Sequence, residues 1–244
     1  MEKRKRFELL DSLRGLTILS MVAFHGTWDL VYLHGMKLPW FGSTPGYVWQ
    51  QSICWTFILL AGFCWKLGRH PLKRGLEVFG CGALVSLVTA LVIPEQRILF
   101  GVLTLLGSCM VLLIPLDKAL RNLSPVAGML GSGALFFLTR NLSRGSLGFE
   151  KLILAKLPGS LYGGWIGAFL GTPGRNFASA DYFPLFPWLF LFLFGYFLCN
   201  LVRKQHWERF LEQGKVPVLS WLGKHSLLVY LLHQPLLSGA MLLL

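Results

Sequence analysis

The feature that most limits how this chain can fold is a series of long apolar segments separated by polar ones. Each segment has about 18 to 25 mostly apolar residues, the length that a helix needs to cross the hydrocarbon core of a bilayer. We count seven such segments: 9–33, 48–67, 74–93, 98–116, 124–140, 184–203 and 220–243. Of the 244 residues, 54% are hydrophobic and 14% are charged, which is too little polar surface for a water-soluble domain of this size. The sequence therefore predicts an all-α, multi-pass transmembrane helix bundle that forms one domain over 1–244. We expect it in the cell membrane if the protein is bacterial.

Basic residues indicate which side of the membrane each loop faces. The chain has 23 Lys and Arg against 11 Asp and Glu, a formal net charge of +12. With a cytosolic N-terminus, 16 of these 23 basic residues lie on the cytosolic side, as the positive-inside rule requires. The excess of basic residues in cytosolic loops thus explains the positive net charge. We therefore expect no nucleic-acid partner. Five cysteines in apolar stretches match no zinc spacing, so we also expect no metal site.

The stretch 141–183 does not fit the pattern as clearly. Its glycines at 163, 167 and 171 have the four-residue spacing that suits close helix packing, which would make the stretch an eighth span. An eighth span would move the basic segment 203–215 to the outside, against the charge bias. We therefore favour an extracytoplasmic or re-entrant element that caps a cavity.

The stretch 9–34, which includes the first apolar segment, contains five ionisable residues: Asp11, Arg14, His25, Asp29 and His34. In a helix, the eleven residues from Arg14 to His25 turn through about 1100°, so both side chains share a face and lie roughly 16 Å apart in depth. Asp29 extends this stripe by one turn. Because an ionisable group at mid-membrane costs about 2.5–3.5 kcal/mol, the stripe is expected to line the bundle interior or a wet cavity. Asp29 is within reach to orient the His25 ring. The alternatives are a water-facing interfacial carboxylate for Asp29, and a structural core histidine for His25.

A second polar stripe lies in the last apolar segment. Lys224 is near its cytosolic end, and Ser226, Tyr230 and His233 follow. His233 comes nine residues after Lys224, which places it near the depth of His25. Two mid-membrane histidines are therefore expected from opposite ends of the sequence. The alternative is that this stripe only provides hydrogen bonds for helix packing.

Four stretches in order resemble the heparan-alpha-glucosaminide N-acetyltransferase catalytic domain family, part of a broader superfamily of transmembrane acyltransferases. They are LLDSLRGLTILSMVAFH, ILFGVLTLLG, DYFPLFPWLFLFLFGYFLC and LSWLGKHSLLVYLLHQPLL, and they extend from residue 9 to about 238. Arg14 and His25 also match the arginine-x10-histidine signature of the related acyltransferase-3 proteins. The sequence departs from the family pattern at Thr104, where a histidine is expected.

This resemblance implies transfer of an acetyl group from cytosolic acetyl-CoA to an amine or hydroxyl of an extracytoplasmic glycan or amino sugar. By position, His25 is the catalytic histidine and Arg14 a donor-side residue. His34 is a second candidate, because the histidine of the human-like branch lies closer to the outer end of this helix. An acetyl-histidine intermediate and direct transfer, with histidine acting only as a base, are both open.

The expected site divides into three groups of residues. The catalytic group is His25, Asp29, His34 and His233. The donor group, whose cations would pair with the phosphates of CoA, is Arg14, Asp11, Lys224, Ser226, Arg69, Lys73 and Arg74. The acceptor group is Asp181, Trp188 and Tyr230. For the basic residues 69–74 and for Trp188, the alternatives are topology charge and an interfacial aromatic belt.

Two other classes of function are considered. A proton-coupled transporter would use the buried His, Asp and Arg residues as an ion relay, but we find no inverted repeat or paired broken helices in the sequence. A structural protein would use the polar stripes only to hold helices together. A homo-oligomer is compatible with any of the three.

Overall fold

The computed structural model describes residues 7–212, 214 and 216–241. It separates into two compact units, and each is described by itself. Unit 1 comprises Met1–Leu60 and Val202–Leu244, and unit 2 comprises Ala61–Leu201. The basic segment 1–6 and Lys215, both predicted to be cytosolic, lie outside the described residues, as do positions 242 and 243 of the last predicted span.

All seven predicted apolar segments form helices. Six of them form one helix each: α1 (Glu8–Tyr32), α2 (Thr44–Cys64), α3 (Pro71–Val92), α4 (Val102–Leu120), α5 (Pro125–Thr139) and α7 (Leu185–Lys204). The seventh segment forms two helices, α9 (Pro217–Lys224) and α10 (Ser226–Met241). Pro71, Pro125 and Pro217 each begin a helix. The amide hydrogens of the first helical turn have no acceptor within the helix, so a proline there costs no hydrogen bond.

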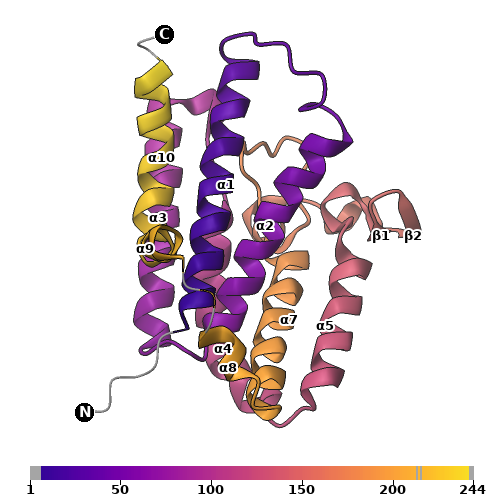
Figure 1. Ribbon diagram of the computed structural model, residues 1–244. Coiled ribbons are helices and arrows are strands. Elements are labelled where there is room, and N and C mark those ends of the chain that lie inside the picture. Colours follow the sequence, from indigo (N-terminus) through magenta and orange to yellow (C-terminus); the bar gives the residue numbers. More distant parts are fainter. Residues whose placement is uncertain (1–6, 213, 215, 242–244) are drawn as a thin grey trace. The chain divides into compact units, whose positions relative to one another are not determined.

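Unit 1 is built around α1. Ile18 and Met21 of α1 form a buried core with Ile53 of α2, and Phe24, Trp49 and Val229, among others, pack against it. The short helix α8 (Glu208–Glu212) precedes α9 and α10. Figure 1 shows α10 beside α1, so the first and last long helices of the chain are neighbours.

The last segment bends where α9 meets the backbone of α1. A Cβ on Gly15 would collide with the carbonyl of Leu219, and a Cβ on Gly223 would collide with the carbonyl of Asp11. The two glycines therefore allow α1 and α9 to touch backbone to backbone. At His225 the backbone leaves helical geometry (φ −107°, ψ 17°), and its Nδ1 lies 2.8 Å from the carbonyl oxygen of Trp221. The predicted single helix over 220–243 is thus wrong, because the chain turns at His225 before α10 follows α1.

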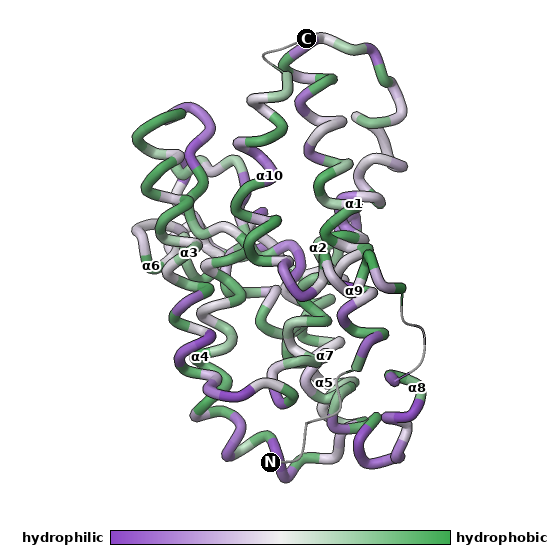
Figure 2. Tube along the Cα trace, turned by 60° about the vertical axis from the view of Figure 1, so that its left-hand side comes forward, coloured by the Kyte–Doolittle hydropathy of each residue, from purple (hydrophilic) through white to green (hydrophobic). Residues whose placement is uncertain are grey.

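Unit 2 contains α3, α4, α5 and most of α7. Leu105, Cys109 and Leu113 of α4, with Phe192 and Tyr196 of α7, are almost completely buried. Among the described residues, three helices, α3, α4 and α7, are long and apolar enough to cross a membrane. Figure 2 shows hydrophobic residues along most of α3 and hydrophilic ones gathered in loops. Membrane insertion follows from these three helices.

The stretch 141–183 holds the exception to the all-α prediction. It contains an antiparallel hairpin of β1 (Ser146–Phe149) and β2 (Leu152–Lys156), and then α6 (Gly164–Leu170). Three short 3-10 helices, at Pro94–Gln96, Leu142–Arg144 and Gly159–Leu161, complete unit 2. Because α6 has only seven residues, the alternative of an eighth spanning helix is wrong. The rest of the protein is mostly helical, as predicted.

Candidate active site

The two predicted mid-membrane histidines meet in unit 1. His25 of α1 and His233 of α10 have ring centroids 4.9 Å apart. His233 is buried and His25 is half-buried. The polar stripe of α1 therefore faces another helix of the same unit. Tyr230, from the expected acceptor group, packs its ring against His233 at 5.5 Å.

The backbone of α10 decides which nitrogen of His233 can accept a proton. Nδ1 of His233 lies 2.5 Å from the carbonyl oxygen of Tyr230. A carbonyl only accepts hydrogen bonds, so Nδ1 must carry the hydrogen and donate it. In the neutral ring, Nε2 then holds the free lone pair. The ring of His233 is thus held as a base in contact with the ring of His25.

Asp29 lies one turn beyond His25 and is completely buried, with 0% of its surface exposed. Both of its carboxylate oxygens accept a hydrogen bond from Nε2 of Gln234, at 3.1 Å each. Within the described part of the chain, the hydrogen-bond partner of Asp29 is therefore Gln234 and not His25. The alternative that Asp29 is a water-facing carboxylate is wrong.

Gln234 is a residue of this cluster that sequence reasoning missed. The one signal for it is its position directly after His233 in the apolar segment LLVYLLHQPLL. His34, the second candidate for the catalytic histidine, lies exposed just beyond the end of α1. It does not join the ring contact of His25 and His233 in the described structure.

Charged residues gather where the first turns of α1 meet α9. Arg14 pairs with Asp11 through an Nη1 to Oδ1 distance of 3.2 Å, and Lys224 lies 3.8 Å from a carboxylate oxygen of Glu8. Ser220 of α9 hydrogen bonds Glu8 at 3.0 Å and also contacts the Ser12 hydroxyl at 3.0 Å. The structure therefore brings the expected donor residues Arg14, Asp11 and Lys224 to one end of unit 1. It adds three residues that the sequence did not single out: Glu8, Ser12 and Ser220. Ser226, another expected donor residue, begins α10 and is half-buried.

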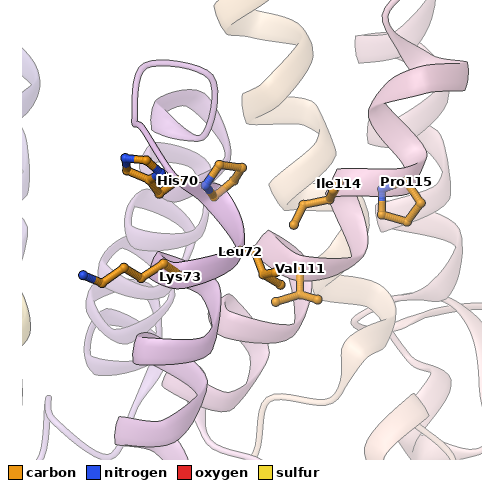
Figure 3. A pocket seen from close by; sticks show the side chains of 7 residues that line it. His70, Leu72, Lys73, Val111, Ile114 and Pro115 are labelled. Carbon is orange, nitrogen blue, oxygen red and sulfur yellow. The ribbon is translucent and has the colours of Figure 1, made fainter.

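The other expected donor residues lie in unit 2, at the start of α3. Arg69 and Lys73 are exposed, and Arg74 is half-buried. Of these three, Lys73 borders an open, mostly apolar groove of about 550 Å³. It is lined by His70, Pro71, Leu72, Lys73, Val111, Ile114 and Pro115. Figure 3 shows Leu72 and Val111 meeting in this groove, while Lys73 extends away from it. Lys73 instead approaches Glu77 at 3.9 Å.

Two expected acceptor residues of unit 2 have structural partners. Asp181 lies at the start of α4, where its Oδ2 accepts a weak hydrogen bond from the Val102 amide at 3.5 Å. Trp188 is buried, and the guanidinium carbon of Arg140 lies 4.8 Å from its ring centroid. Neighbouring Tyr182 donates a hydrogen bond to the carbonyl of Ala168, and burial raises the pKa of its phenol to about 12.

The departure from the family pattern at residue 104 has a packing explanation. Thr104 is buried on α4, where a Cβ on Gly82 of α3 would come within 2.6 Å of its hydroxyl oxygen. The two helices approach so closely here that a longer side chain at 104 would have to push α3 away. Within this packing, a histidine at residue 104 would not fit.

Comparison with known families decides the assignment. The family model of the heparan-alpha-glucosaminide N-acetyltransferase catalytic domain matches residues 6–235. The chain belongs to this family. The match covers nearly the whole sequence and confirms the resemblance carried by the four motifs. The protein is thus a member of an acetyltransferase family that acts on glycans, and the transporter alternative is not favoured. No curated protein and no solved structure matches the chain.

Among the described residues, no three His, Cys, Asp or Glu side chains come together in a way that could hold a metal ion.

Proposed function

We propose that the protein transfers the acetyl group of cytosolic acetyl-CoA to an amine or hydroxyl of a glycan on the opposite side of the membrane. The observation that carries the proposal is the contact between the imidazole rings of His25 and His233. A pair of bases between two helices of an acetyltransferase family is suited to moving a proton from acceptor to leaving group.

The donor would bind at the cytosolic end of unit 1. Arg14 and Lys224 lie there as cations, each beside one carboxylate, and phosphate groups of CoA are stronger partners for them. Asp11 and Ser226 would position these side chains. The basic residues Arg69, Lys73 and Arg74 of unit 2 would form a second candidate site for phosphate groups of the donor. The narrow pantetheine arm would then carry the thioester toward His25, about three helical turns away.

The chemistry requires that one bond is exchanged for another and that one proton passes from the acceptor, through His25, to the leaving group. A neutral imidazole of His25 accepts a proton from the acceptor as its nitrogen or oxygen attacks the thioester carbon. The C–S bond breaks, a C–N or C–O bond forms, and the proton passes to the CoA thiolate. His233 lies next to His25 with its Nε2 lone pair available.

The topology that serves this reaction is a single domain with seven spans and a cytosolic N-terminus. His25 and His233 then lie at mid-depth, where a thioester from the cytosol and a glycan from the other side can meet. On the outer side of unit 1, His34 and Tyr230 would contact the acceptor, while Asp181 and Trp188 are acceptor-binding candidates of unit 2. The stretch 141–183, which contains the hairpin and α6, would form an outer element of unit 2.

The test is acetyl transfer by purified protein, with labelled acetyl-CoA and a glucosamine-terminated glycan. The variant His25→Ala is expected to lose activity by about 10²–10⁴-fold, the usual contribution of a general base, and to keep its affinity for acetyl-CoA. The control is His206→Asn, which changes an exposed histidine whose positive φ of 56° asparagine tolerates. Full transfer by His25→Ala would contradict the proposal.

A further inference from the structure

The amide of Gln234 has a fixed orientation. Its Nε2 faces both oxygens of the Asp29 carboxylate at 3.1 Å. Because a carboxylate accepts hydrogen bonds and does not donate them, the atom that faces Asp29 must be the amide nitrogen. The carbonyl oxygen Oε1 is therefore held on the other side of the amide and cannot exchange places with the nitrogen.

Oε1 of Gln234 is buried and has no hydrogen-bond partner among the described residues. A carbonyl oxygen left in this state is unfavourable, and native structures rarely contain one without a reason. A natural partner is a donor that arrives with the substrate. The position supports this, since the Asp29–Gln234 contact lies one turn of α1, roughly 6 Å, from the contact between His25 and His233.

Two hydrogen-bond acceptors thus belong to neighbouring contacts between α1 and α10. One is the lone pair of an imidazole, and the other is Oε1 of Gln234. An attacking amine has two N–H groups in addition to its lone pair, so it can give one hydrogen to the imidazole and donate the other to Gln234. An attacking hydroxyl has a single hydrogen, which leaves one of the two acceptors buried and unpaired.

We infer that Gln234 is the residue that selects an amine over a hydroxyl acceptor, by accepting a hydrogen bond from the second N–H of an amino sugar. The inference rests on the proposed function, because it takes the histidine pair as the base. It gives Gln234 a residue-level role in recognising the amine that an N-acetyltransferase family acetylates.

The test distinguishes the donor role of the Gln234 amide nitrogen from the acceptor role of its carbonyl oxygen. Gln234→Lys keeps a donor for Asp29 and removes the acceptor oxygen, whereas Gln234→Met removes both and can also destabilise the fold. Binding of glucosamine, glucose and acetyl-CoA is measured calorimetrically on the purified full-length protein. For Gln234→Lys we expect glucosamine affinity to fall about tenfold, which corresponds to roughly 1.4 kcal/mol. Glucose and acetyl-CoA affinities are expected to stay within about twofold. Gln50→Lys, on an exposed position of α2, is the matched control.

Each result decides between the two proposals. The role of Gln234 is overturned if Gln234→Lys binds glucosamine with wild-type affinity. It is also overturned if the substitution lowers the affinity for acetyl-CoA as much as the affinity for glucosamine. Failure of the wild type to bind glucosamine overturns it as well. If the wild type binds glucosamine in a Gln234-dependent way but transfers no acetyl group, the reaction is wrong and the binding role stands.

Discussion

The contact between α1 and α9 gives the most direct prediction from the packing. Gly15 lies in the interior of α1, and a Cβ at this position would overlap the carbonyl group of Leu219. The substitution Gly15→Ala must therefore push α9 away from α1. That shift would also loosen the hydrogen bond between Ser12 and Ser220, which lies one turn away at 3.0 Å.

The magnitude follows from a comparison within the same helix. Gly26 also lies inside α1, but its Cβ would have ordinary contact with Leu237, at 3.5 Å. Both substitutions gain the same helix propensity, about 1 kcal/mol, so it cancels in their difference. What remains is the overpacking cost at Gly15, about 1–3 kcal/mol. For a chain of this size, it corresponds to a Tm about 2–12 °C lower for Gly15→Ala than for Gly26→Ala.

The assay is thermal unfolding of both purified variants in the same detergent, with the wild type alongside. We expect Gly26→Ala to unfold at or slightly above the wild-type Tm and Gly15→Ala well below it. Equal Tm values for the two variants would refute the backbone contact between α1 and α9. A loss of stability in Gly26→Ala alone would show that α10, rather than α9, makes the tight contact.

Three further predictions address other parts of the chain. Arg14→Ala is expected to raise the KM for acetyl-CoA about tenfold with little change in kcat, because one charge-assisted phosphate contact is lost; initial rates test this. Asp117→Ala should lower the free energy of unfolding by about 1–3 kcal/mol in denaturant titrations, because its Oδ1 pairs with Lys66 at 3.3 Å and accepts the Tyr196 hydroxyl at 2.5 Å. The raised pKa of Tyr182 means that its neutral phenol stabilises the folded state below pH 10; this stability should disappear as pH rises toward about 12, and Tm measurements should show a smaller loss in Tyr182→Phe.

Helices and the histidine pair could be predicted from sequence because both depend on regular spacing. An apolar run of about twenty residues has few folding options in a membrane, so α3, α4 and α7 end close to their predicted bounds. Residue counts from Arg14 and Lys224 predicted similar depths for His25 and His233. Their rings are in contact, although the chain turns at His225, between Lys224 and His233.

The features that were missed depend on partners far away in the chain or on a single side chain. The β hairpin is held by buried Asn141, whose amide reaches the carbonyls of Glu150 at 3.0 Å and Leu152 at 3.4 Å. Gln234 bonds to a residue 205 positions earlier. Neither contact can be predicted from periodicity, because a single polar residue in an apolar segment does not produce a repeating pattern.

The distance in sequence between Asp29 and Gln234 has a consequence for synthesis in the cell. At about 5–20 residues per second, a ribosome adds the 205 residues between them in about 10–40 s. During this time the nascent α1 carries a carboxylate without the amide that will later hold it. An incomplete chain, cut short before α10, would keep that unsatisfied group and would lack His233. Such a fragment should be inert toward thioesters and recognisable to the quality-control proteases of the cell.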